Sequence, residues 1–193
     1  NLEMLLWAAR NGGDSGWHAL AERHALTSAR AHVRPDGSTA HVALFDPATG
    51  ALEGTVTWQG YSDSSAWARG QAWAIHGLTT SFGKTRNPAL LEAARRAADY
   101  FIGNLPPDGI PYWDFRHPLI PRTERDASAG AIASAGLLDL ARHVDRADSE
   151  RYRAAAERML GALASSYLTV GTPNAAILQH SVGGRPQNVE IDV

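Results

Sequence analysis

The chain has 193 residues, enough for one domain with a sizeable core, and its 44% hydrophobic and 20% charged residues are ordinary for a globular protein. A net charge of -2 argues against a nucleic-acid partner, and no run approaches the roughly eighteen apolar residues that mark a membrane span. The absence of cysteine excludes disulfides, thiolate metal sites and a cysteine nucleophile. Since this composition is compatible with a reducing compartment, we expect a cytoplasmic protein.

The first third of the chain combines helical and strand signals. Residues 1–10 predict a helix that an Asn-Gly-Gly run ends, and Asp14 predicts the N-cap of a second helix over 14–32. Residues 39–58 differ, because two stretches of strand-compatible residues flank the turn signal at 46–50. We therefore expect a β-hairpin excursion near 39–58.

The remaining two thirds predict four more helices. The third is expected to be capped by Asp63 or Ser64 and the sixth by Asp148 or Ser149. Asp126 and Ser128 open the fifth, whose small residues indicate close packing. Apolar helices alternate with more charged ones, which favours an all-α, two-layer arrangement in one domain over 1–193. The predicted ranges are 64–83, 87–103, 126–144 and 149–167.

Arg69 is the most informative charged residue. It shares one face of the helix over 64–83 with Trp73 and His76, at spacings of four and seven residues. An arginine among apolar and aromatic residues needs an acidic partner or an anionic ligand. One interpretation is an internal ion pair, with Asp63, Asp114 or Asp126 as partner. The other is a sugar acid, whose carboxylate binds the guanidinium while its ring stacks on tryptophan.

Other candidate groups are less specific. His41 lies in the first predicted strand and Gln59 follows the second, so both are expected just before the helix over 64–83. Each residue type more often has a structural role. No zinc, calcium or phosphate-binding motif is present, and we expect neither a metal nor a cofactor.

Residues 57–73 carry a family resemblance. The run Thr57-Trp58-Gln59-Gly60-Tyr61-Ser62-Asp63, continuing into Trp67-Ala68-Arg69-Gly70-Gln71-Ala72-Trp73, resembles glycoside hydrolase family 88, the unsaturated glucuronyl hydrolases. Further blocks at 32–42, 45–50, 111–115 and 125–131 resemble the same family, so that the likeness covers nearly the whole chain.

This resemblance implies a fold and a reaction. The family folds as an (α/α)6 barrel, of which this chain would form about half. Its enzymes remove the 4,5-unsaturated uronic acid from the non-reducing end of lyase-generated oligosaccharides. A carboxylic acid protonates C4 of the vinyl ether, water adds at C5, and the resulting hemiketal collapses to release the next sugar. The implied partner is therefore an unsaturated oligosaccharide substrate.

The resemblance also assigns roles to individual residues. His41 and Gln59 match the family's active-site histidine and glutamine, which would orient the water and hydrogen-bond the sugar. Arg69 matches an arginine near the substrate, and Trp67 and Trp73 match aromatic positions of the pocket wall. His180 lies in a late loop that approaches the pocket in the family.

The family's acid/base aspartate would precede Asn1, and a second essential aspartate would lie further upstream. The chain is therefore expected to be a fragment, inactive by itself, with exposed apolar surface where the rest of the barrel would pack. Two alternatives remain open. One is an unsaturated galacturonyl or rhamnogalacturonyl hydrolase, which the run Gln71-Ala72-Trp73 disfavours. The other is a non-catalytic, helical carbohydrate-binding module.

Overall fold

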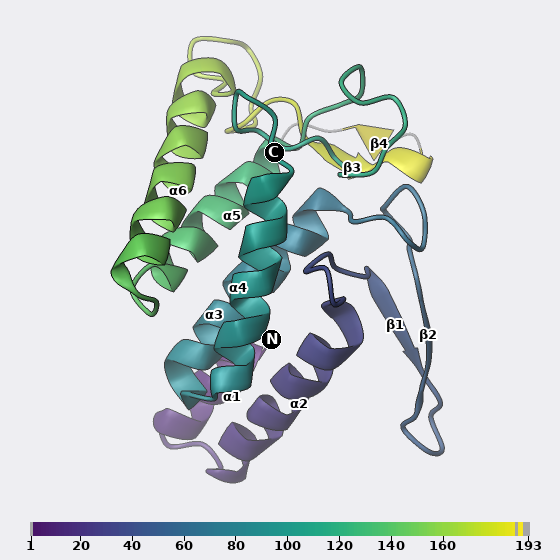
Figure 1. Cartoon of the computed structure of the whole chain (residues 1–193), viewed down its shortest axis with the longest axis vertical. Helices are drawn as coiled ribbons and strands as arrows, with labels where there is room; N and C mark the ends of the chain where they lie inside the picture. Colours follow the sequence, from purple (N-terminus) through teal and green to yellow (C-terminus); the bar gives the residue numbers. More distant parts are fainter. Residues whose placement is uncertain (1, 188, 191–193) are drawn as a thin grey trace.

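A computed structural model describes residues 2–187, 189 and 190. These residues form six α-helices, two small β-ribbons and one 3-10 helix, η1 (Figure 1). The mostly helical chain with one hairpin in its first third is therefore confirmed. The helices are α1 Leu2–Arg10, α2 Gly16–His32, α3 Ala68–Thr85, α4 Pro88–Gly103, α5 Ala127–Leu140 and α6 Arg146–Ser166.

Helix α3 is the centre of the helical body. It packs most extensively against α5 and α4, and α5 packs in turn against α6. The expected close packing of α5 is confirmed at Gly136, where an added Cβ would lie 2.9 Å from the backbone nitrogen of His76 on α3. Ile75, Leu137 and Phe101 are fully buried between these helices. Their burial from water is the main source of stability for such a core.

Three helices begin at a residue whose side chain accepts a hydrogen bond from the first turn. Asn87 caps α4, Asp126 caps α5 and Asp145 caps α6. The expected cap of α6 at Asp148 or Ser149 was wrong, because the helix begins earlier, at Arg146. Asp148 instead binds Arg95 and Arg151 through its carboxylate.

The start of α3 also differs from the prediction. The helix begins at Ala68 rather than near 64, and its N-cap, Trp67, makes no side-chain cap hydrogen bond. Asp63 is not a cap, because its carboxylate accepts the Thr57 backbone N–H at 2.8 Å. The side chain therefore holds the hairpin to the loop that precedes α3.

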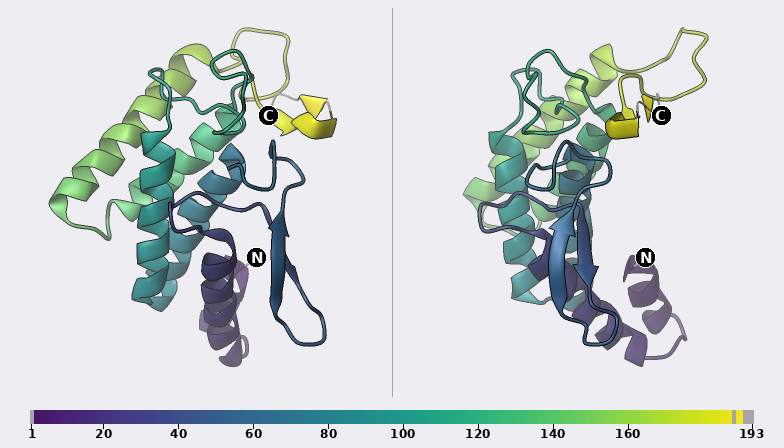
Figure 2. Two further views of the ribbon diagram at one scale, coloured as in Figure 1. Left: turned by 45° about the vertical axis from the view of Figure 1, so that its right-hand side comes forward. Right: turned by 90° about the vertical axis from the view of Figure 1, so that its right-hand side faces the viewer.

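The hairpin consists of β1 Val42–Phe45 and β2 Leu52–Val56, paired antiparallel with Val42 opposite Val56. The expected turn is confirmed: the Asp46 carboxylate accepts the backbone N–H groups of Ala48 and Thr49. Figure 2 shows the hairpin beside α2, projecting from the helical body. Its open end leads to the start of α3, so that residues flanking both strands meet there.

The last described segment returns to the same end of α3. Strands β3 Val182–Gly184 and β4 Val189–Glu190 pair antiparallel around η1, Arg185–Gln187. Gln187 reaches the hairpin, since its side-chain Nε2 donates to the Trp58 carbonyl at 3.0 Å. Three segments distant in sequence therefore converge at the N-terminus of α3 (Figures 1 and 2).

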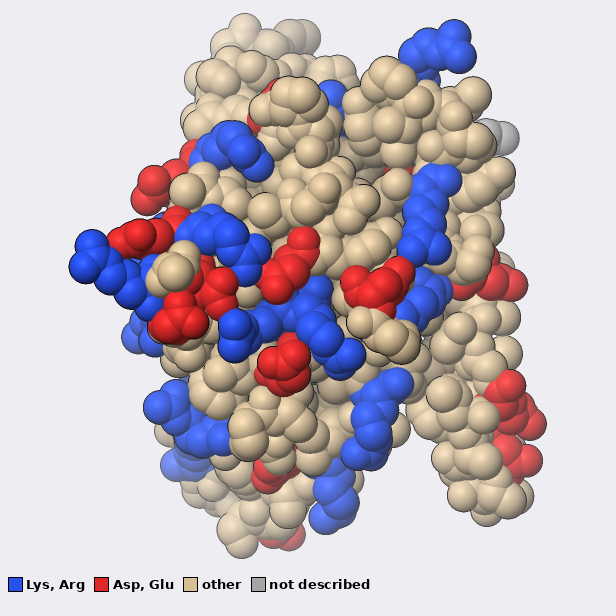
Figure 3. Space-filling model, viewed as in Figure 1, with Lys and Arg blue, Asp and Glu red and all other residues tan. Residues whose placement is uncertain are grey.

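Charged side chains gather over one part of the surface, and large apolar side chains are exposed on α1. Basic and acidic side chains intermix over α4 and α6, where Arg95 pairs with Asp148 and Arg151 with Asp99 (Figure 3). Helix α1, by contrast, leaves Met4 and Trp7 more than 60% exposed. No helix among the described residues is long and apolar enough to cross a membrane.

Candidate functional site

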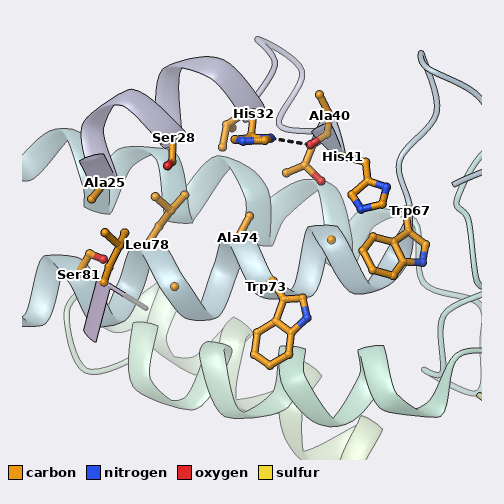
Figure 4. A pocket seen from close by; sticks show the side chains of 15 residues that line it. Ala25, Ser28, His32, Ala40, His41, Trp67, Trp73, Ala74, Leu78 and Ser81 are labelled. Carbon is orange, nitrogen blue, oxygen red and sulfur yellow. Dashed lines mark hydrogen bonds between the residues drawn. The ribbon is translucent and has the colours of Figure 1, made fainter. Parts of the chain in front are cut away.

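A mostly apolar groove of about 320 Å³ lies between α2 and α3, below the start of the hairpin (Figure 4). One wall comes from α2 and the segment that follows it. The other wall is a stripe of α3 that includes Gly70, Trp73 and Gly77. His41 and Trp67 line the end of the groove nearest the hairpin, and His32 lines the wall further along (Figure 4). Three of the six predicted site residues, His41, Trp67 and Trp73, therefore share one groove.

His41 is held by the backbone that follows β2. Its Nδ1 accepts the N–H groups of Trp58 and Gln59, at 3.1 and 3.2 Å. Since a neutral imidazole carries one N–H, these bonds assign its hydrogen to Nε2. Burial lowers the pKa of His41, and His32 and Arg69 lower it further by charge repulsion. His41 is therefore a neutral ring at pH 7, with an Nε2–H donor.

Trp67 supports His41 from below. The two rings have centroids 4.5 Å apart at an interplanar angle of 38°. The Cζ of Arg69 lies 4.8 Å from the same indole, within the range of a cation–π contact. The indole Nε1 is buried and has no hydrogen-bond partner among the described residues. Trp67 thus forms a fixed floor between a histidine and an arginine.

The Gly183 carbonyl joins two further predicted residues. It accepts a hydrogen bond from Nε2 of Gln59 at 2.6 Å and another from Nη2 of Arg69 at 3.2 Å. Arg69 Nη2 also donates to the Val182 carbonyl. The chain of hydrogen bonds from His41 through Gln59 and Gly183 to Arg69 therefore crosses three separate segments, and we call it the Gly183 junction.

Asp126 extends the junction to α5. Its Oδ2 lies 2.8 Å from Arg69 Nη1, and its Oδ1 accepts the Ala129 N–H at 3.1 Å. The internal ion pair weighed for Arg69 is thus present, with Asp126 as the partner. Burial raises the pKa of Asp126, while Arg69 and the Ala129 N–H oppose that shift. Because both oxygens accept from groups that bring their own hydrogens, the carboxylate is the form that fits this geometry at neutral pH.

Arg34 and Asp114 fix the loops around the junction without lining the groove. Arg34 donates to the backbone carbonyls of Thr39, Asp63 and Ser65. The buried carboxylate of Asp114 accepts the Ser65 hydroxyl at 2.6 Å and the Tyr61 N–H at 2.9 Å. The segments on both sides of the hairpin are therefore tied to the start of α3.

The chain matches known proteins over nearly all its length. No protein-family model matches it. An unsaturated glucuronyl hydrolase from Formosa agariphila is 41% identical over 196 residues, covering 100% of this chain and 48% of that protein. An unsaturated chondroitin disaccharide hydrolase from Streptococcus pyogenes is 37% identical, over 94% of this chain and 46% of that protein.

Solved structures of the same kind of enzyme also match the fold of this chain. The unsaturated glucuronyl hydrolase of Bacillus sp. GL1 superposes with a TM-score of 0.93 at 37% identity, over 99% of this chain and 52% of that one. The chain is a relative of the unsaturated glucuronyl hydrolases. It spans about half the length of the curated relatives it matches. A mutant of the Streptococcus agalactiae enzyme, solved in complex with dGlcA-GalNAc6S, matches with a TM-score of 0.87 at 33% identity, over 100% of this chain and 52% of that one.

In this relative of the unsaturated glucuronyl hydrolases, Trp73 and His180 occupy different surroundings. Trp73 is 52% exposed and projects from α3 at the groove. His180 has a left-handed backbone, with φ of 63°, and its carbonyl accepts the Ala127 N–H at 3.0 Å. Its ring packs edge-on against Tyr167 at 5.8 Å, outside the groove lining. A substrate contact for His180 therefore stays a prediction.

Sequence reasoning gave no role to two groups that the structure brings into the site. Gly183 acts through a backbone carbonyl, which no side-chain pattern reveals. His32 lines the groove from the end of α2, and its only sequence signal is its place at the start of the block over 32–42. Among the described residues, no group of three or more His, Asp or Glu side chains is arranged to hold a metal ion.

Proposed function

We propose that this chain forms the sugar-binding part of an (α/α)6-barrel hydrolase. The substrate would be a 4,5-unsaturated uronic acid at the non-reducing end of a lyase-generated oligosaccharide. The similarity to unsaturated glucuronyl and chondroitin disaccharide hydrolases supports this proposal. So does the helix packing, in which α1, α3 and α5 would be inner helices and α2, α4 and α6 outer ones.

The observation that carries the proposal is the Gly183 junction beside the Trp67 floor. It ties Gln59 and Arg69 to one carbonyl and Gln59 to His41. An apolar groove lined by His41 and two indole rings, with the polar groups of the junction next to it, suits a sugar whose ring faces are apolar and whose edge is polar. A uronate adds one negative charge, which a guanidinium attracts.

Each residue of the junction would have a defined part in binding. His41 would donate from Nε2–H to a water or sugar oxygen. Gln59 has its Nε2 on Gly183, so its Oε1 would accept a hydrogen bond from the same region. Together they would orient the water that adds at C5, while the aspartate expected upstream of Asn1 acts as the general acid and base.

Arg69 would attract the uronate mainly as a fixed positive charge. Its hydrogen bonds to Asp126, Val182 and Gly183 use both N–H groups of Nη2 and one of Nη1. The remaining donors are Nε–H and the second hydrogen on Nη1. Because Asp126 offsets part of the charge, the pair would favour an acidic sugar without binding every anion tightly.

The choice between glucuronyl and galacturonyl substrates rests on the relatives and not on Gln71. That side chain is fully buried and donates to the carbonyls of Gly37 and Ala97, at 2.7 and 2.9 Å. Gln71 therefore has a structural role in the core and does not line the groove. The relatives' glucuronyl and chondroitin specificities favour a glucuronyl substrate here. A cytoplasmic location stays a prediction from the cysteine-free composition.

A binding titration with a parallel turnover assay tests the proposal. The chain would be titrated calorimetrically with an unsaturated glucuronyl disaccharide, its galacturonyl counterpart and the saturated disaccharide. The ultraviolet absorbance of the C4=C5 bond would report turnover. We expect the unsaturated glucuronyl sugar to bind best, with little or no loss of absorbance.

Two variants make the result specific. Arg69→Met should weaken binding, whereas Arg153→Met, an exposed change on α6, should not. Equal affinity for all three sugars would contradict the substrate assignment. Rapid turnover by this chain alone would contradict the upstream position of the acid/base. Retained binding in Arg69→Met would remove the arginine from the site.

A further inference from the structure

His32 has one ring nitrogen committed to the fold and one that is not. It is the last residue of α2, and its Nδ1 lies 3.0 Å from the Ala40 carbonyl. A carbonyl oxygen only accepts hydrogen bonds, so Nδ1 is the donor. In the neutral ring, Nε2 then keeps a free lone pair. The ring lines the groove and is only partly buried (Figure 4).

His41 has the opposite arrangement. Its Nδ1 accepts two backbone N–H groups, which leaves the hydrogen on Nε2. His32 is hydrogen-bonded to Ala40, the residue just before His41, and both rings line the same groove. The two histidines therefore bring one acceptor and one donor to a wall that is otherwise mostly apolar.

Neither Nε2 has a hydrogen-bond partner among the described residues. A sugar offers hydroxyl groups, which both donate and accept hydrogen bonds, so it can use an acceptor and a donor on the same wall. Each sugar hydroxyl in an apolar groove needs such partners, because leaving it unpaired would disfavour binding.

We propose that His32 is a substrate-binding residue whose Nε2 accepts a hydrogen bond from a sugar hydroxyl, beside the donor that His41 supplies from Nε2–H. The inference rests on the proposed function for the class of ligand. It adds a residue to the recognition of that ligand and gives the two histidines complementary roles. His32 Nε2 would accept a hydrogen bond from a sugar hydroxyl, and His41 Nε2–H would donate one to a sugar or water oxygen.

Two substitutions separate this role from a structural one. His32→Asn keeps a donor near the position of Nδ1, so it retains the bond to the Ala40 carbonyl and removes the Nε2 acceptor. His32→Gln places its amide near the position of Nε2 and gives up the bond to Ala40. A purely structural His32 would tolerate asparagine better, whereas a substrate-binding His32 would tolerate glutamine better.

The experiment measures the affinity of the full chain for the unsaturated glucuronyl disaccharide, with urea unfolding of each variant in parallel. We expect His32→Asn to bind about three- to tenfold more weakly, the size of one neutral hydrogen bond, at an unchanged unfolding midpoint. His32→Gln should bind within about twofold of the original chain but unfold at lower urea. Unchanged affinity in His32→Asn would overturn the inference and leave the proposed function intact.

A second measurement covers the case in which His32→Asn does not fold. The ¹⁵N resonance of His32 Nε2 in the unsubstituted chain should move when the disaccharide is added, because the lone pair gains a hydrogen-bond donor. A resonance that stays in place at saturation would overturn the inference. If the unsubstituted chain binds no disaccharide, both the inference and the proposed function fail.

Discussion

Replacing Asp126 with alanine tests the contact between α3 and α5 at the candidate site. The carboxylate is fully buried, caps α5 through the Ala129 N–H and lies 2.8 Å from Arg69. Removing a helix cap destabilises a protein by about 0.5–2 kcal/mol. Removing one partner of a buried ion pair adds about 3–5 kcal/mol.

The lower end of that second range applies here. The Arg69 side chain keeps 12% exposure, and it would retain the carbonyls of Val182 and Gly183 as acceptors. We therefore expect Asp126→Ala to lower the free energy of unfolding by about 4 kcal/mol in total, a large share of the roughly 5–15 kcal/mol typical of a domain. Asp145→Ala is the matched control, because Asp145 is an exposed cap of α6 and should cost only about 1 kcal/mol.

Urea unfolding followed by circular dichroism measures both variants. The difference of about 3 kcal/mol between them isolates the ion pair from the cap. Adding Arg69→Met to Asp126→Ala should recover part of the loss, because the unpaired charge is then gone. If Asp126→Ala costs no more than Asp145→Ala, the pair is not a stabilising part of the site and the reasoning fails.

Three further predictions follow from single contacts. The fold lowers the pKa of His41 below its usual value of about 6.5, so the stability that the neutral ring contributes is fully present above that pH and is lost as pH falls through the folded pKa. Between about pH 8 and pH 5.5, urea unfolding should therefore show a larger loss of stability for the original chain than for His41→Asn. Equal losses in the two chains would contradict this prediction. Gly37 has φ of 84°, and a Cβ at this position would lie 2.3 Å from the Arg96 carbonyl oxygen, so Gly37→Ala should destabilise the chain by more than about 2 kcal/mol. Gly50 has φ of 71° but open space around it, so Gly50→Ala should cost only about 1–2 kcal/mol in the same assay. Trp73 is 52% exposed, so Trp73→Ala should change stability by less than about 1 kcal/mol while weakening disaccharide binding in a calorimetric titration; unchanged affinity would remove Trp73 from the site.

The order and type of the helices followed from local sequence signals. Asn87 and Asp126 were identifiable as helix starts because a cap acts within three residues of its own position. The same rule was wrong for Asp63. Its carboxylate accepts the backbone N–H of Thr57, next to the hairpin, and its carbonyl accepts a hydrogen bond from Arg34. Local patterns do not record which distant segment competes for a side chain.

The site was predictable only in part for the same reason. From the sequence, three aspartates were possible partners of Arg69, and only the fold selects Asp126. The roles expected for His41, Gln59 and Arg69 came from the family resemblance, and the structure adds that one carbonyl, that of Gly183, links the last two. Gln71 shows the limit of a sequence signature, since the residue that marked the glucuronyl branch lies in the core.

The most direct test of the account is to map the bound sugar on the chain by NMR. A ¹⁵N-labelled sample would be titrated with the unsaturated glucuronyl disaccharide. We expect saturable shifts at the backbone amides of His41, Gln59 and Gly183 and at the indole N–H groups of Trp67 and Trp73. Shifts confined to the charged surface over α4 and α6, or no saturable shift anywhere, would contradict the assignment of the groove as the sugar-binding site.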